Sequence, residues 1–372
     1  MPVKPEDLVL AGMVAVVCAS AVAGLSALLV WRQRAARGAG LVVRLAFSGA
    51  LTVFLGASLL LGLEAYLRFA SDATDSFALT RTTQRWFERH YQRNSWHLRD
   101  DTDYTVAKST SRRRISFVGD SFTAGHGVPD VANRFANRLR EAHPDWEIHV
   151  LARNGLDTAT ELRLLERTLD RGYETDEIVL VYCLNDIAEL LPEWRKTVER
   201  IYDGADGFLV RNSYALNRLY FRLWKARDPE VADYFAIVAN AYEGAVWQRQ
   251  KHLLRRFARL ADERGIRFRV VTFPFLHALG PDYAYAAVHE RLGRLWGALG
   301  VPHLDLLDVY AGMSPDELVV NRFDAHPNER AHALAADAIG AFLERGVRQQ
   351  EAHPDADPHP GERLELPLPE AL

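Results

Sequence analysis

Five short apolar runs constrain the fold of this chain more than any other feature of its sequence. The runs have the length and β-branched content of buried strands: 115–118, 146–151, 177–182, 267–273 and 301–307. Stretches of helical character lie between these runs or after the last one: 131–142, 158–169, 235–263, 283–299 and 331–345. Strands that alternate with helices predict βαβ units with right-handed crossovers, and therefore a parallel sheet.

The first apolar run ends at Gly119-Asp120-Ser121. The carboxyl ends of the strands are where open α/β sheets place their chemistry. A serine on such a turn is exposed and rigidly aimed, as a nucleophile must be. Ser121 could instead do no more than cap the helix that follows the strand. The turn therefore makes Ser121 a candidate nucleophile that needs partners elsewhere in the chain.

A serine nucleophile needs a base and a group that orients the base. The segment Phe323-Asp324-Ala-His326-Pro-Asn328 stands just before the last helical stretch and supplies both residue types. Its acid or amide could alternatively cap that helix. The turns after the second and third runs hold Gly155 and Asn185. A backbone N–H of Gly155, the N–H of Ser121 and the amide of Asn185 would converge where an oxyanion develops.

In this order the motifs resemble those of the SGNH or GDSL-type hydrolases, and specifically of their bacterial membrane-anchored members. Gly119-Asp120-Ser121-Phe122 resembles the first block of that family. Gly155 and Asn185 resemble the second and third blocks, and Asp324-Ala-His326 resembles the last. The resemblance extends over residues 90–346.

The resemblance implies a three-layer α/β/α sandwich with a flavodoxin-like, parallel, five-stranded sheet. It implies Ser121 as the nucleophile, His326 as the base and Asp324 as the acid. It implies an oxyanion hole made by Ser121, Gly155 and Asn185. No metal or organic cofactor is needed for such chemistry.

Two positions depart from the family pattern. The family usually places its aspartate three residues before the histidine, where this chain has Phe323, whereas Asp324 stands two before. The third block usually has a glycine where this chain has Cys183. Either the local turn absorbs the shift of the acid, or a backbone carbonyl orients His326 and the acid matters less.

Two apolar runs near the N-terminus are long enough to cross a bilayer, which takes about 20 residues. Leu8–Trp31 has no charged residue, and Leu41–Leu63 has only Arg44 near its start. The loop between them holds three arginines and no acid: Arg32, Arg34 and Arg37. The positive-inside rule then predicts two spans of the inner (cytoplasmic) membrane with both termini, and the catalytic domain, outside the cytoplasm. A cleaved signal peptide fits less well, because the segment before the first run is not basic and the run exceeds about 7–15 residues.

The predicted organisation has four parts. These are a two-helix transmembrane anchor (1–68), a polar linker or N-terminal extension (69–113), the hydrolase domain (114–346) with a cap-like insertion (187–235), and a disordered tail (347–372). The chain has 372 residues and a formal net charge of −4, so nothing in its charge indicates binding to nucleic acid. Its two cysteines, Cys18 and Cys183, do not indicate a redox compartment.

These observations predict a membrane-anchored serine ester hydrolase that acts outside the cytoplasmic membrane through an acyl-serine intermediate. Its predicted partner is an acyl-ester substrate, on a glycan or a lipid. Two alternatives stay open at this point. One is an O-acyltransferase of a cell-envelope polysaccharide, and the other is a non-catalytic scaffold or glycan-binding protein of the same fold. The substrate and the oligomeric state are left open.

Overall fold

The computed structural model describes residues 4–34, 41–109, 111–203, 207–228, 231 and 233–352. By its contacts the chain divides into two compact units. The first contains Met1–Trp86 and Val198–Ala232, and the second contains Phe87–Thr197 and Asp233–Leu372. Helices α3 (Arg81–His90) and α7 (Pro192–Asp203) cross the boundaries between these ranges.

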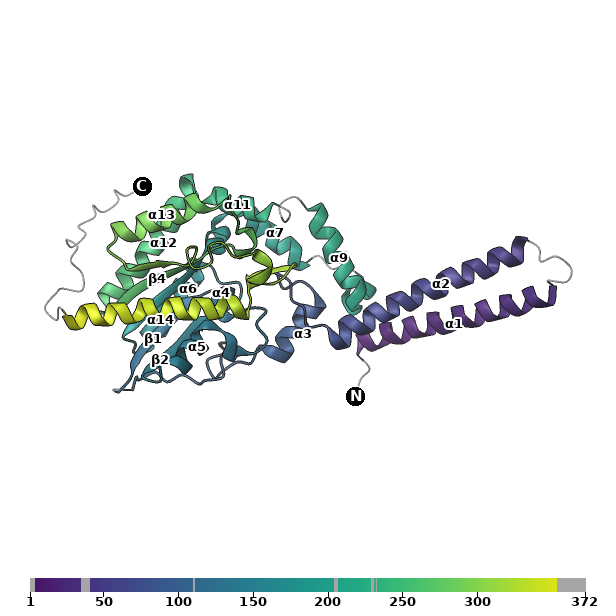
Figure 1. The fold of residues 1–372 in the computed structure, drawn as a ribbon, viewed down its shortest axis with the longest axis horizontal. Coiled ribbons are helices and arrows are strands. Elements are labelled where there is room, and N and C mark those ends of the chain that lie inside the picture. Colours follow the sequence, from purple (N-terminus) through teal and green to yellow (C-terminus); the bar gives the residue numbers. More distant parts are fainter. Residues whose placement is uncertain are drawn as a thin grey trace. The chain divides into compact units, whose positions relative to one another are not determined.

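The second unit is built on the predicted parallel sheet (Figure 1). Its strands are β1 (Arg113–Gly119), β2 (Trp146–Ala152), β3 (Glu177–Cys183), β4 (Arg267–Phe273) and β5 (His303–Asp305). They lie in the order β2-β1-β3-β4-β5, and every neighbouring pair is parallel. Strand β1 therefore lies between β2 and β3, so the turns after these three strands share one edge of the sheet. The side chains of Ile115, Phe117 and Val118 in β1 are fully buried, as expected for a parallel sheet covered on both faces.

Helices cover the sheet on both sides. They are α4 (Ser121–Ala124), α5 (Phe135–Ala142), α6 (Thr158–Asp170), α11 (Tyr234–Ala241), α12 (Gly244–Glu263), α13 (Ala286–Ala298) and α14 (Glu329–Ala352). Short 3₁₀ turns connect them: η3 (Val131–Asn133), η4 (Leu184–Leu190), η5 (Leu276–Ala278) and η6 (Pro315–Glu317). Helix α5 packs with α14, and α6 packs with α12 (Figure 1). The predicted α/β class with a five-stranded parallel sheet between helices is confirmed.

Several predicted boundaries differ from the structure. The strand predicted over 301–307 is shorter, because β5 contains only His303–Asp305. The single helix predicted over 235–263 is two helices, because the chain leaves the helical path between α11 and α12. The helix predicted over 131–142 begins as the 3₁₀ turn η3 before α5. Helix α14 continues to Ala352, past the predicted start of the tail at 347, and the rest of that tail lies outside the described residues.

Two long apolar helices, α1 (Pro5–Arg34) and α2 (Leu41–Ala65), dominate the first unit and pack against each other (Figure 1). A π-helical turn, η2 (Tyr66–Ala70), extends α2. Both helices have the length and composition of membrane spans. Two further helices of this unit, α8 (Phe208–Asn212) and α9 (Tyr214–Arg227), come from the segment predicted as a cap-like insertion.

Candidate active site

Ser121 is the first residue of a single helical turn, α4, that begins where β1 ends. The Asp120 carboxylate caps this turn by accepting a hydrogen bond of 2.8 Å from the backbone N–H of Phe122. The turn is tight because Gly119 has no side chain: a Cβ atom there would collide with Thr123 and lie 2.8 Å from the carbonyl oxygen of Val181. The local sequence therefore holds the serine at the carboxyl edge of the sheet.

The structure brings Ser121, His326 and Asp324 together in one hydrogen-bonded chain. Nδ1 of His326 lies 2.5 Å from Oδ1 of Asp324, and its Nε2 lies 2.8 Å from Oγ of Ser121. A carboxylate can only accept, so Nδ1 carries the proton and Nε2 is free to accept from the serine hydroxyl. The structure therefore brings together the three residues that the sequence predicted for one site, while their catalytic roles stay predictions.

The short spacing between Asp324 and His326 follows from the local backbone. Both residues lie on β7 (Asp324–Pro327), which pairs with β6 (Val319–Asn321) in a small antiparallel sheet that the sequence did not predict. Side chains two residues apart on a strand point to the same face. An extended strand thus lets an acid two positions before the histidine reach the ring, and the alternative of a backbone carbonyl on Nδ1 is not what the structure has.

The Asp324 carboxylate lies in a fully buried position between two histidines. Burial alone would raise the pKa of this carboxyl. The neighbouring His326 and His126, through their charge and their hydrogen bonds, outweigh burial and hold the pKa of Asp324 well below its usual range. The carboxylate is therefore ionised at neutral pH, as a group that stabilises an imidazolium must be.

His126 is a residue of the site that the sequence reasoning missed. Its Nε2 lies 3.2 Å from Oδ2 of Asp324, the oxygen that His326 Nδ1 does not use. Its Nδ1 lies 2.6 Å from Nδ2 of Asn154, which donates to it. The side chain is buried. The one sequence feature that could have indicated His126 is its place between Gly125 and Gly127, five residues after the candidate nucleophile.

The loop that carries His126 is held close to Asp324 by two features. A Cβ atom at Gly127 would lie 2.9 Å from Val320 Cγ1 and 3.2 Å from Oδ2 of Asp324, so the close approach needs glycine. The buried guanidinium of Arg99 donates hydrogen bonds to three carbonyls of the loop, those of Ala124, Gly125 and Val128. Burial, and then the charge of Arg134, lowers the pKa of Arg99 to about 9. Part of the predicted linker, 69–113, is therefore structural support for the site.

The candidate oxyanion residues lie on the turns after the two strands that flank β1. The Asn185 side chain donates from Nδ2 to Oδ2 of Asp120 at 3.2 Å, and the same carboxylate oxygen lies 3.3 Å from Oγ of Ser121. Asn185 is therefore next to the nucleophile. Gly155 is exposed on its turn, with open space around its Cα. Convergence of these donors on an oxyanion stays a prediction.

Three of the residues could in principle bind a metal ion, because suitable atoms of His126, Asp324 and His326 all lie within 4.8 Å of one another. The hydrogen bonds already described use all four ring nitrogens of the two histidines. The described geometry thus fits a proton-transfer chain better than a set of metal ligands.

A buried carboxyl group lies within electrostatic reach of Asp120. Glu161 on α6 is fully buried, and neither of its oxygens has a hydrogen-bond partner among the described residues. Burial, and then the charges of Asp120 and Asp157, raises its pKa well above the usual value. Burial and the charge of Glu161 likewise raise the pKa of Asp186.

Replacing Glu161 with glutamine is expected to stabilise the protein above pH 5. The pKa of Glu161 is higher in the folded state than the unfolded value of about 4.3, so its ionisation destabilises the fold increasingly as pH rises between the two. The loss of folding free energy is about 1.4 kcal/mol for each pH unit in that interval. The melting temperature of the purified chain, measured in detergent from pH 5 to pH 8, should fall less steeply in Glu161→Gln than in the wild type. Parallel curves for the two proteins would contradict this assignment.

No family model and no curated protein matches the chain. The chain is similar to a number of solved structures, and three of them are described here. A Desulfitobacterium hafniense protein described as belonging to the G-D-S-L family is 11% identical, with 62% of this chain and 100% of that one covered and a TM-score of 0.38. An extracellular lipase from Streptomyces rimosus is 12% identical, with 63% and 99% covered and a TM-score of 0.41. The acetyl xylan esterase AlAXEase is 12% identical, with 62% and 99% covered and a TM-score of 0.39. The first of these proteins is described by the name of the family whose motifs this sequence resembles.

Proposed function

We propose that this chain is a membrane-anchored serine ester hydrolase of the SGNH type. The observation that carries the proposal is the hydrogen-bonded chain from Asp324 through His326 to Ser121 at the carboxyl edge of the sheet. A serine, a histidine that can accept its proton and a buried acid that orients the histidine are the parts that acyl transfer to and from a serine requires.

In the proposed reaction, Oγ of Ser121 attacks the carbonyl carbon of an ester while Nε2 of His326 takes the hydroxyl proton. Asp324 stabilises the imidazolium that forms. The tetrahedral intermediate collapses, the C–O bond to the alcohol breaks, and His326 returns its proton to the departing alcohol. Water then attacks the acyl-serine with His326 again as the base, which releases the acid and restores Ser121.

The backbone N–H groups of Ser121 and Gly155 and the amide of Asn185 are proposed to stabilise the oxyanion. The amide of Asn185 has two hydrogens, so one can remain on Asp120 while the other meets the oxyanion. Asn185→Ala is expected to lower kcat about 100-fold or more, because an oxyanion donor acts mainly in the transition state. Initial rates with a p-nitrophenyl ester, on samples with matched melting temperatures, would measure the loss. Full activity in the folded variant would remove Asn185 from the site.

His126 is proposed to position Asp324. A hydrogen bond to a charged group contributes about 1.5–3 kcal/mol, so His126→Ala should lower kcat roughly tenfold to hundredfold. KM should change little, because His126 contacts the carboxylate of Asp324 and is not proposed to contact the substrate. Glutamine can donate to Asp324 from its amide, so His126→Gln should recover part of kcat. A melting temperature that falls in both variants while kcat stays unchanged would show that the role of His126 is structural only.

The site is proposed to act outside the cytoplasmic membrane, as the arginine-rich loop between the spans predicts. From that location, its proposed substrates are acylated glycans or lipids. The test uses the full chain in detergent with p-nitrophenyl acetate and with longer-chain esters. Turnover that depends on Ser121 supports the hydrolase, and the chain-length profile separates a carbohydrate deacetylase from a lipase-like enzyme. Acyl groups found on a supplied polysaccharide, with none released to water, would favour the acyltransferase instead.

A further inference from the structure

The start of helix α9 is attached to the end of the second apolar helix. Glu64, in the last turn of α2, is fully buried. Its carboxylate accepts hydrogen bonds from Oγ of Ser213 at 2.7 Å and from the backbone N–H groups of Tyr214 and Ala215 at 3.0 and 2.8 Å. A carboxylate at a helix N-terminus accepts hydrogen bonds from N–H groups that have no partner within the helix. Its negative charge also interacts favourably with the positive end of the helix dipole. The buried acid thus sets where α9 leaves the anchor.

One face of α9 continues the apolar surface of the anchor. Ala215 packs with Leu67, and Leu60 lies against the same cluster. Leu60 lies one helical turn before Glu64 in α2, within the apolar span. Leu219 and Leu223 follow Ala215 at intervals of four and therefore lie on the same face of the helix. They are 51% and 48% exposed, so this face begins against α2 and then continues with side chains that are about half exposed.

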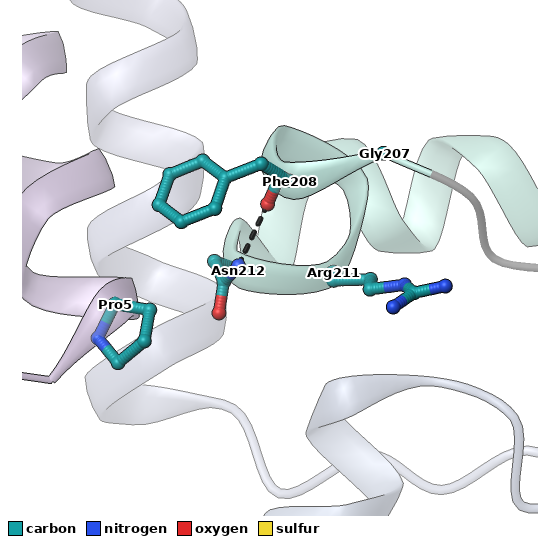
Figure 2. Close-up of a pocket in the computed structure, with 5 residues that line it drawn as sticks. All are labelled: Pro5, Gly207, Phe208, Arg211 and Asn212. Carbon is teal, nitrogen blue, oxygen red and sulfur yellow. Dashed lines mark hydrogen bonds between the residues drawn. The ribbon is translucent and has the colours of Figure 1, made fainter.

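Helix α8 adds two more exposed apolar side chains at the start of α1. Phe208 and Leu209 are each 56% exposed, although α8 contacts α1. A pocket of about 420 Å³ separates part of α8 from the first residue of α1, and it is lined by Pro5, Gly207, Phe208, Arg211 and Asn212. Figure 2 shows the Phe208 ring extending toward the helices of the anchor, while the Arg211 side chain extends away from them.

Helix α8 and the start of α9 contact the spans at the end where the spans become polar. Arg68, in the turn η2 that extends α2, pairs with Asp7 at the start of α1 at 2.5 Å, and it also donates to the carbonyl of Glu6. Tyr66 and Phe69, in the same turn as Arg68, are exposed. Paired charges and exposed aromatic rings at the end of two apolar spans are typical of the boundary between membrane and water. In Figure 1, α9 runs across the direction of α1 and α2 rather than along them.

We propose that α8 and α9 lie in the membrane interface and insert Phe208, Leu209, Leu219 and Leu223 among lipid acyl chains beside the anchor. This inference rests on the proposed membrane anchor and extends it. An amphipathic helix with leucine and phenylalanine on its uncovered face is stable in that position, because lipid covers the apolar side while polar side chains stay at the headgroups. The partner is therefore the bilayer surface itself.

The test is spin-label accessibility of the full chain in bilayers of phosphatidylcholine and phosphatidylglycerol. Nitroxides are attached at Phe208→Cys, Leu219→Cys and Leu223→Cys in a Cys18→Ala background, in which the remaining Cys183 is buried. Two exposed apolar positions serve as references: Leu25→Cys in the span and Val106→Cys in the second unit. The measured quantity is the ratio of accessibility to oxygen over accessibility to a water-soluble nickel chelate.

The three labels are expected to give a ratio well above that at Val106 and toward that at Leu25. A ratio equal to that at Val106 would overturn the inference, because the helices would then lie in water. Labels shielded from both oxygen and nickel would also overturn it, since protein rather than lipid would cover the face. If Leu25 itself behaves like Val106, the anchor fails together with the inference. Ester turnover of the same unlabelled preparation tests Ser121 separately from both.

Discussion

Replacing Ser121 with alanine is expected to remove almost all ester hydrolysis, a fall in kcat of about 10⁴-fold or more. The reason is that Oγ of Ser121 is the only atom of the proposed chain that forms a bond to the substrate. His326 and Asp324 act through it, and neither is placed to attack a carbonyl without it. The residual rate should be that of a protein with an oxyanion hole and no nucleophile.

The measurement is the initial rate of p-nitrophenyl ester hydrolysis by the full chain in detergent. Ser116→Ala is the matched control. Ser116 lies on β1, the strand that ends just before Ser121. It is buried and hydrogen-bonds to Tyr173 at 2.8 Å and to Thr175 at 2.9 Å, away from the proposed catalytic residues. Hydrolysis that survives in Ser121→Ala as it does in Ser116→Ala would mean that another group carries the reaction.

The second large effect is expected for Asp324→Asn, a fall in kcat of about 10³–10⁴-fold with little change in KM. An asparagine amide in this place would donate to Nδ1 of His326 instead of accepting from it. The ring would then carry its proton on Nε2, where it could not take the proton of Ser121. The size and shape of the side chain stay almost the same, so the loss would come from the tautomer.

This second prediction also decides between two explanations of the unusual spacing. If Asp324 were only a helix cap or a surface acid, Asp324→Asn would leave kcat nearly unchanged. The wild-type and variant chains can be compared by kcat, KM and melting temperature in the same detergent. A folded variant with unchanged kcat would mean that His326 does not need the acid two positions before it.

Much of the fold could be predicted from sequence because the sheet is parallel and buried. Strands β1 and β3 have largely continuous apolar runs and β2 has an alternating one, and Ser121, Asn154 and Asn185, residue types that favour turns, each stand two residues after the end of a strand. The serine and histidine could be predicted from these turns and from the segment before the last helix. The spacing of Asp324 and His326 became clear only with the backbone, since i and i+2 share a face on a strand but not on a helix.

The glycines on either side of His126 indicate a turn, but the role proposed for His126 could not be predicted because it depends on a long-range arrangement. It reaches Asp324 only when the turn after α4 folds over the sheet edge, and Arg99 holds that turn from a position 25 to 29 residues earlier in the chain. Neither residue shows a spacing pattern that indicates the contact. The same holds for Glu64, which follows an apolar span in sequence and is buried only because Ser213 and the start of α9 meet it.

The most direct test of the central claim is covalent labelling of the full chain in detergent with a fluorophosphonate, followed by peptide mass spectrometry. Such a probe reacts with a serine that an adjacent base activates, whatever ester the enzyme prefers. We predict a single adduct on the peptide that contains Ser121, strongly reduced in His326→Ala and in Asp324→Asn. A folded wild-type chain with no adduct, or with its adduct on another residue, would contradict the assignment of Ser121 as an activated nucleophile and favour a non-catalytic protein of the same fold.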